Sequence, residues 1–173
     1  WGYASAPEPH LGDRTIACPR GRVLGGSSSV NAMAFVRGQH RDYDDWAASG
    51  LTGWGWKECL PYFKKVETFS EGEDAFRGGG GPVHVTQPIY STPLNSTFLQ
   101  ACAEAGYSCG IDTNGASQEG FGAMDQTIYR GRRESASKAY LGPVKRRPNL
   151  RVLTSVMVDR VLLDDGHASA VEM

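Results

Sequence analysis

The segment that decides how this chain is interpreted is residues 19–38, which read PRGRVLGGSSSVNAMAFVRG. Its basic, strand-prone first residues lead to a pair of glycines, Gly25 and Gly26. Glycine accepts positive φ angles and lets the backbone approach another group closely, so the pair predicts a sharp turn. Serines follow at positions 27–29, and serine is a favoured N-cap residue. The segment therefore predicts a strand-to-helix turn, with a helix that begins among these serines.

Such a turn can hold a ligand or serve only the fold. The first N–H groups of a helix lack partners within it, and the positive end of the helix dipole attracts a phosphate or another electron-rich group. A tight turn without a ligand has the same residues, and a short motif is only a hypothesis. From these residues alone both interpretations remain open.

Composition and charge restrict the class of protein. The chain has 173 residues, enough for one domain with a core or for parts of two. Apolar residues make up 40% and charged residues 21%, which indicates a globular chain rather than a disordered one. A net charge of -1 provides no overall attraction to nucleic acid, so no nucleic-acid partner is predicted. The apolar runs are too short for a transmembrane span or a signal peptide.

The cysteine spacing predicts the state of the thiols, and the two ends of the sequence predict whether it is a whole protein. Cys18, Cys59, Cys102 and Cys109 have no C-x-x-C spacing and no neighbouring histidine, so they predict free, partly buried thiols and no metal site. Free thiols favour a reducing compartment. Because the chain starts without Met and stops inside a predicted strand, we expect an internal piece of a longer protein.

Hydrophobic periodicity predicts a mixed α/β (α+β) chain of short elements. Residues 70–81, acidic and then RGGGG, are predicted to be a flexible linker at a domain boundary. Residues 1–18 should be extended loop. Helices are predicted from residue 42 to 48, from about 58–60 to 68 with Pro61 in the first turn, at 93–106 and at 135–147. Strands are predicted at 82–87, 121–129, 150–154, 158–163 and 168–173.

Several residues are functional candidates by their own chemistry, and each also has a structural interpretation. The four histidines are isolated in sequence, and a surface or structural role fits each of them better than catalysis. The basic segment 130–151 fits a solvated helix face better than a nucleic-acid stripe, because only Tyr140 could stack on a base. Trp46, Trp54 and Trp56 fit core packing better than a cage for a cation.

A longer stretch carries a family resemblance. Residues 21–44, GRVLGGSSSVNAMAFVRGQHRDYD, resemble the first signature of the glucose–methanol–choline (GMC) oxidoreductases, flavoproteins that oxidise alcohols. The segments 42–50, 53–67, 76–86, 118–141 and 147–154 are similar to the choline dehydrogenase branch of that family. The signature positions that match are Gly21, Arg22, Leu24, Gly25, Gly26, Ser27, Ser28, Val30, Asn31, Phe35, Gly38 and Asp44.

The resemblance implies an FAD site and oxidation of a small alcohol, most closely choline to betaine aldehyde, with hydride transfer to flavin N5. Ser27 would face the pyrophosphate, and residues 31–34 the isoalloxazine ring. Some relatives attach their flavin through a histidine where this chain has Val30, so non-covalent FAD is expected. The resemblance implies these cofactor-binding residues: Val23, Gly25, Gly26, Ser27, Asn31, Ala32, Met33, Ala34 and Val158.

The family's G-x-G-x-x-G unit and its catalytic histidine are not in these 173 residues, so no catalytic residue is assigned and little or no activity is expected of the chain alone. Residues 1–70 and 151–173 would form part of the FAD-binding domain. Residues 71–150 would form part of a substrate domain, in which strands 82–87 and 121–129 join an antiparallel sheet.

Other functions remain open within and outside the family. The resemblance allows oxidation of an aryl alcohol or glucose, and a flavin-containing cyanohydrin lyase. A basic nucleic-acid-binding module is the alternative of another class. Membrane association of the full-length protein, mitochondrial or bacterial, and a cytoplasmic location are both compatible with the resemblance, and the number of subunits is open.

Overall fold

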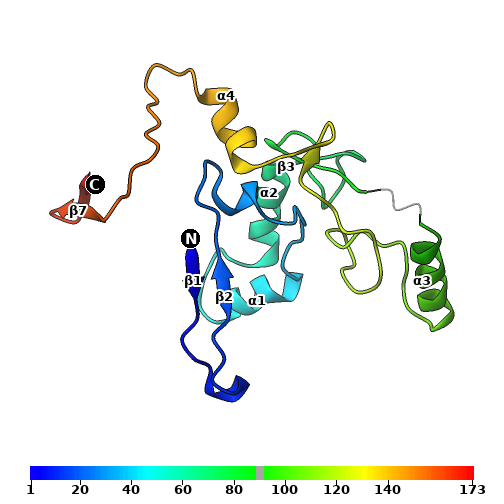
Figure 1. The fold of residues 1–173 in the computed structure, drawn as a ribbon. Coiled ribbons are helices and arrows are strands. Elements are labelled where there is room, and N and C mark those ends of the chain that lie inside the picture. The colour runs from blue at the N-terminus through cyan, green and yellow to red at the C-terminus, as the bar shows by residue number, and fades with distance from the viewer. Residues whose placement is uncertain (89–91) are drawn as a thin grey trace. The chain divides into compact units, whose positions relative to one another are not determined.

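The computed structural model describes residues 1–88 and 92–173. These residues form two units, Trp1–Leu141 and Gly142–Met173 (Figure 1). Short helices alternate along the chain with two-stranded ladders. This mixture of helices and small sheets confirms the predicted α/β (α+β) class. None of the helices within the described residues is long and apolar enough to cross a membrane.

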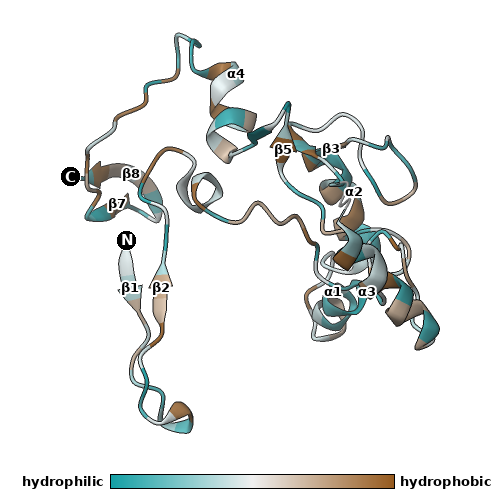
Figure 2. Cartoon of the chain, turned by 45° about the vertical axis from the view of Figure 1, so that its right-hand side comes forward, coloured by the Kyte–Doolittle hydropathy of each residue, from teal (hydrophilic) through white to brown (hydrophobic). Residues whose placement is uncertain are grey.

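The first unit begins with a hairpin rather than the predicted extended loop. Strands β1 (Gly2–Ala4) and β2 (Ala17–Pro19) pair antiparallel, and a 3-10 turn, η1 (Pro9–Leu11), lies between them in sequence. Figure 2 shows β2 as the more apolar of the two strands. The prediction of a loop was wrong because two strands of three residues are too short to show an alternation of apolar and polar residues. Each strand also pairs with residues more than ten positions away in the sequence.

Helices α1 (His40–Ala48) and α2 (Trp56–Val66) follow and pack against each other (Figure 1). A capping box between Gln39 and Asp42 starts α1. The Asp44 carboxylate accepts a hydrogen bond of 2.9 Å from the Trp56 N–H, so it caps α2. This cap explains why α2 begins at residue 56 and not at 58–60 as predicted. Pro61 lies inside the helix.

The glycine-rich segment before residue 82 connects two parallel strands. Strand β3 (Glu67–Phe69) pairs with β4 (Val83–Val85), and Thr68 lies opposite His84. Strand β4 confirms the strand predicted at 82–87. The segment between β3 and β4 is not the predicted flexible hinge, because Arg77 is fully buried within it.

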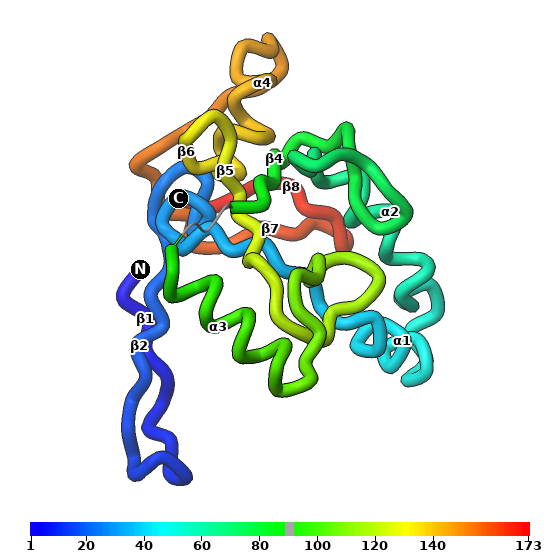
Figure 3. Tube along the Cα trace, turned by 90° about the vertical axis from the view of Figure 1, so that its right-hand side faces the viewer, coloured from blue at the N-terminus to red at the C-terminus, as the bar shows by residue number. Residues whose placement is uncertain are grey.

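Helix α3 (Pro93–Glu104) confirms the helix predicted at 93–106 and is capped by the Thr92 side chain. The chain then turns back beside it (Figure 3), where Phe98 meets Phe121 edge-to-face at 5.5 Å. Within the predicted strand 121–129 only β5 (Ile128–Tyr129) forms, and it pairs antiparallel with β6 (Arg132–Arg133).

The end of the first unit and the second unit contain the remaining elements. The predicted helix 135–147 forms over residues 136–144, but its first part, η3 (Ser137–Leu141), is π-helical and only the short α4 (Gly142–Val144) after it is α-helical. Glycine and proline at positions 142 and 143 disfavour a regular helix there. Strands β7 (Arg160–Asp164) and β8 (His167–Glu172) form the predicted C-terminal hairpin, whereas residues 150–154 form no strand.

All four cysteines are free thiols. Cys102 is buried in α3 and the other three are partly buried, which confirms the prediction from their spacing.

Candidate functional site

The Gly25–Gly26 pair forms the predicted turn, with φ angles of 89° and 56°. Instead of an α-helix, only a four-residue 3-10 helix, η2 (Gly26–Ser29), follows. The Ser28 hydroxyl donates to the carbonyl of Gly25 at 2.5 Å, so the serine bonds back to the turn. The predicted helix among the serines was therefore wrong, and a helix dipole no longer supports an anion site here.

The backbone before the turn comes very close to it at Gly21. A Cβ on Gly21 would lie 2.3 Å from the carbonyl oxygen of Gly26, so only glycine fits at position 21. The Gly21 N–H donates to Ser27 Oγ at 3.1 Å, which leaves the Ser27 hydroxyl proton available as a donor. Ser27 itself is exposed. The turn thus presents a hydroxyl donor beside open space at Gly26, where an added Cβ would meet nothing within 4 Å.

Residues 33–35 lie beside residues 125–127, some 90 residues later in the chain. Met33 has a φ of 64°, and its carbonyl accepts a hydrogen bond of 2.9 Å from the Thr127 N–H. The Phe35 N–H donates to the carbonyl of Asp125 at 2.8 Å, and Ala34 forms a bridge with Gln126. The ladder holds the predicted isoalloxazine residues in a fixed backbone conformation.

The predicted cofactor residues divide between the two units. Eight of them lie on one continuous segment of the first unit: Val23, Gly25, Gly26, Ser27, Asn31, Ala32, Met33 and Ala34. Val158 belongs to the second unit, where it precedes β7 and is 50% exposed.

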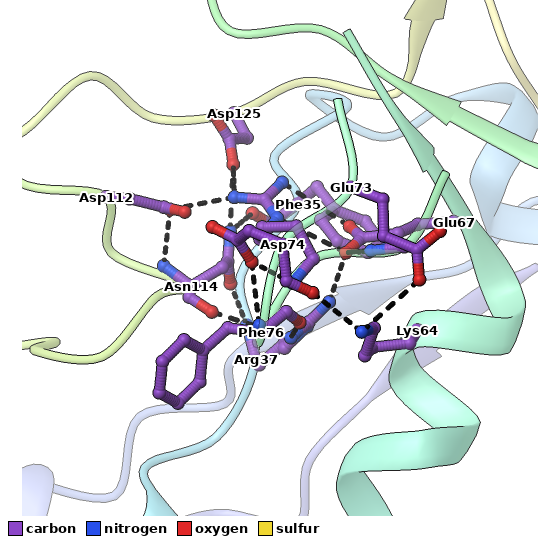
Figure 4. Close-up of polar contacts among 12 residues, drawn as sticks. Phe35, Arg37, Lys64, Glu67, Glu73, Asp74, Phe76, Asp112, Asn114 and Asp125 are labelled. Carbon is purple, nitrogen blue, oxygen red and sulfur yellow. Dashed lines mark hydrogen bonds and ion pairs between the residues drawn. The ribbon is translucent and has the colours of Figure 1, made fainter. Parts of the chain in front are cut away.

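A buried cluster of charged residues begins at Arg37, three residues after the predicted cofactor segment 23–34. The sequence alone did not reveal this cluster. Its centre is the Arg77 guanidinium, which pairs with Glu67, Asp112 and Asp125. Figure 4 labels these three acidic residues. Arg77 Nη1 lies 2.8 Å from Asp125 Oδ2 and 2.7 Å from Asp112 Oδ1, and its Nε and Nη2 contact Glu67 at 3.2 and 3.3 Å. The ring of Phe69 lies 3.5 Å from the guanidinium carbon.

Arg37 ties the candidate segment to this cluster. The Arg37 guanidinium pairs with Glu67, and the backbone N–H of Arg37 donates to Asn114 Oδ1 at 2.8 Å. Asn114 Nδ2 in turn donates to Asp125 Oδ2 at 3.0 Å. The five residues that form the centre of the cluster are all buried, and they are Arg37, Glu67, Arg77, Asn114 and Asp125.

The two arginines of the cluster respond differently to burial. Burial lowers the pKa of Arg37 from its usual value, and the nearby charge of Glu67 only partly opposes this effect. Burial also acts to lower the pKa of Arg77, but the hydrogen bond to Asp125 and the charge of Glu67 outweigh it and raise that pKa. Arg77 therefore keeps its positive charge beside the buried carboxylates of Glu67 and Asp125.

Asp74 is expected to make a small contribution to the stability of the fold that is lost at acid pH. Burial acts to raise its pKa, but the N–H groups of Arg77 and Phe76, at 2.6 and 2.7 Å, lower it below the usual value of 3.8. A carboxylate with a depressed folded-state pKa stabilises the fold above its unfolded pKa, and this stabilisation is lost as the pH falls through the folded value. We expect Asp74→Asn to lower the urea midpoint at pH 7 and the difference from wild type to shrink as the pH falls below about 4. A difference that stays constant from pH 7 to pH 2 would contradict this assignment.

Comparison with known proteins shows the family of the chain. The model of the GMC oxidoreductase family matches residues 8–173. The chain is 46% identical over all 173 residues to an oxygen-dependent choline dehydrogenase of Brucella anthropi, and it spans 31% of that protein. It thus covers about a third of the curated relatives that it matches.

Solved structures show the same fold. The pyridoxine 4-oxidase from Mesorbium loti superposes with a TM-score of 0.90 at 33% identity, over 99% of this chain and 34% of that one. An FAD-dependent oxidoreductase from Chaetomium thermophilum superposes with a TM-score of 0.87 at 33% identity, over 98% of this chain and 32% of that one. With the family signature on the turn and nearly the whole chain matched, this protein belongs to the GMC oxidoreductase family.

Proposed function

We propose that the full-length protein oxidises a small alcohol with FAD, and that choline is its substrate. The observation that carries this proposal is the family signature folded as a glycine–serine turn, with Ser27 exposed, followed by a segment held by backbone hydrogen bonds, residues 25–34 together. The identity of 46% to a relative named choline dehydrogenase favours choline, because the pyridoxine oxidase is only 33% identical.

The residues present fit a flavin nucleotide. The open space at Gly26 and the free hydroxyl proton of Ser27 suit the phosphate end of the cofactor. Asn31 is exposed and its amide nitrogen can donate to a ring carbonyl. When bound, FAD would accept the hydride from the alcohol carbon. The chain's own residues would hold the cofactor, and Val30 in place of a histidine leaves no side chain for a covalent link at that position.

A base that removes the alcohol proton is proposed to come from outside these 173 residues. His84 stacks on Tyr129 with ring centroids 3.7 Å apart, and its Nδ1 lies 3.2 Å from Glu134. His40 stacks on Trp56 at 3.9 Å. Because structural contacts occupy both rings, we propose no catalytic residue in the chain and expect no alcohol turnover by the chain alone.

The domain assignment remains a proposal as well. Residues 1–70 and 151–173 would contribute to an FAD-binding domain, with Val158 near the adenine, and residues 71–150 to a substrate domain. The antiparallel bridge between Thr86 and Gln126 supports the second part, since it joins the two segments expected in one sheet.

Replacing Gly26 tests the cofactor site. In the full-length protein we expect Gly26→Ala to weaken FAD binding about tenfold or more, since the new methyl group would enter the space proposed for the cofactor. The measurement is quenching of flavin fluorescence on titrating the apoprotein. Gly106→Ala is the matched control: Gly106 also has a positive φ, of 86°, and no atom within 4 Å of an added Cβ, but it follows α3. Equal FAD affinity in wild type and Gly26→Ala would refute the site.

Two further measurements separate the finer parts of the proposal. Precipitation of the holoprotein with acid should release all of its FAD if the cofactor is not covalently bound. Turnover of choline should exceed that of pyridoxine and of benzyl alcohol under the same conditions. Faster turnover of either competitor would replace choline as the substrate while leaving the cofactor site intact.

A further inference from the structure

Arg133 reaches the candidate segment across about a hundred residues of sequence. Its Nη1 lies 2.6 Å from the carbonyl oxygen of Asn31, 2.8 Å from Asn31 Oδ1 and 3.3 Å from the carbonyl oxygen of Ser28. Within the described residues no carboxylate lies within ion-pair distance of its side chain. The half-buried guanidinium therefore directs its charge at the turn and not at an acidic partner.

These contacts determine which end of the Asn31 amide faces outward. Asn31 Oδ1 accepts from Arg133 Nη1 and also from the Met33 N–H at 3.1 Å. Both partners are donors only, so the atom between them must be the oxygen and not the nitrogen. The amide nitrogen then points away from Arg133, and no hydrogen bond occupies it in the parts of the chain that the structure describes.

The two residues belong to a closed circuit of hydrogen bonds. Met33 donates to the Asn31 side chain and accepts from the Thr127 N–H at 2.9 Å. The Thr127 carbonyl accepts from the Glu134 N–H at 2.8 Å, and Glu134 is the residue next to Arg133. The circuit holds Met33 at its positive φ, a conformation that is unfavourable for a residue with a side chain.

We propose that Arg133 is a positioning residue for the flavin: it fixes the Asn31 amide so that Nδ2 donates a hydrogen bond to the isoalloxazine ring. The proposal rests on the proposed function, because it needs FAD at residues 31–34. Arg133 need not touch the cofactor. Its effect on the flavin passes through Asn31.

The test uses the full-length protein with Arg133→Gln and, as the matched control, Arg132→Gln, which lies exposed on the same strand β6. We expect Arg133→Gln to weaken FAD binding about tenfold, since a hydrogen bond to a charged group is being lost, and Arg132→Gln to leave the affinity unchanged. The visible absorption and circular dichroism of bound flavin should shift in Arg133→Gln and not in the control. Arg133→Lys, which keeps the charge, should recover part of both effects.

A double-mutant cycle with Asn31→Ala decides whether the effect passes through Asn31. In the Asn31→Ala background, Arg133→Gln should change neither FAD affinity nor the flavin spectrum further. An effect as large as in wild type would overturn the positioning role, while FAD binding itself would still stand. Should Arg133→Gln fail to fold, Arg133→Lys in both backgrounds provides the same comparison. A wild-type protein that binds no FAD would instead refute the proposed function.

Discussion

Arg77→Met is expected to lower the free energy of unfolding by about 3–5 kcal/mol. Methionine fills much of the volume of the arginine stem but carries no charge. Asp125, which is 1% exposed, would then keep only the Asn114 amide as a partner in the cluster. A buried carboxylate without a counter-ion is far more costly than the loss of an exposed ion pair. Urea unfolding of the full-length protein, followed by tryptophan fluorescence, measures the change.

A control variant and a second substitution show whether Arg77→Met destabilises the fold through the lost charge or through the changed side-chain volume. Arg41→Met removes an exposed arginine whose Nε lies 3.7 Å from Asp45, and it should change the urea midpoint little. Asp125→Asn should destabilise the wild type but partly restore Arg77→Met, because it removes the charge that was left uncompensated. If the double variant is as unstable as the sum of the two single variants, the loss comes from packing and not from buried charge.

Elements made of local contacts could be predicted from the sequence. The α3 helix has its cap, its apolar face and its terminating glycine within one stretch of 15 residues, and the β7–β8 hairpin has its turn at Asp165-Gly166. The Gly25–Gly26 turn was predicted for the same reason. Each of these signals is complete within the segment that it describes.

The buried cluster could not be predicted because its partners are far apart in sequence. Arg37 contacts Asn114 across 77 residues and Arg77 contacts Asp125 across 48. Taken singly, each residue looks like an ordinary surface charge, and Arg77 lies in a glycine run that suggests mobility. The predicted helix after Ser27 failed for a related reason, because the pairing of residues 33–35 with 125–127 outweighs the local preference of the serines.

In the candidate site, too, some features could be predicted from one segment and others depend on residues far apart in sequence. The family resemblance implies that residues 31–34 lie at the cofactor, but it could not show what holds their backbone. Their supports, Thr127 and Arg133, belong to the predicted strand 121–129 and to the basic segment 130–151, and neither prediction placed them beside residues 31–34. A basic side chain that faces a turn instead of solvent is recognisable only once the two segments lie together.

The second large effect on stability is expected in the glycine run of residues 78–81, where the same substitution by alanine meets different neighbouring atoms at each position. A Cβ on Gly78 would lie 1.9 Å from the Lys64 carbonyl oxygen and 2.9 Å from that of Glu67, both backbone atoms that cannot rotate away. Gly78→Ala is therefore expected to cost about 1–3 kcal/mol or more, as overpacking does in a fixed interior. Gly80 has nothing within 4 Å of an added Cβ, so Gly80→Ala should be neutral or slightly stabilising.

The size of the Gly78 effect depends on the ionic cluster as well as on the clash. The Gly78 N–H donates to Glu67 Oε1 at 2.9 Å, the same oxygen that contacts Arg77 Nε. Any backbone shift that accommodates the new methyl group must pull this donor, and the adjacent Arg77, away from the buried carboxylate. Gly78→Ala and Arg77→Met should therefore be less than additive in urea unfolding, while Gly80→Ala and Arg77→Met should add. Strict additivity in both pairs would mean that the glycine run and the cluster are energetically independent.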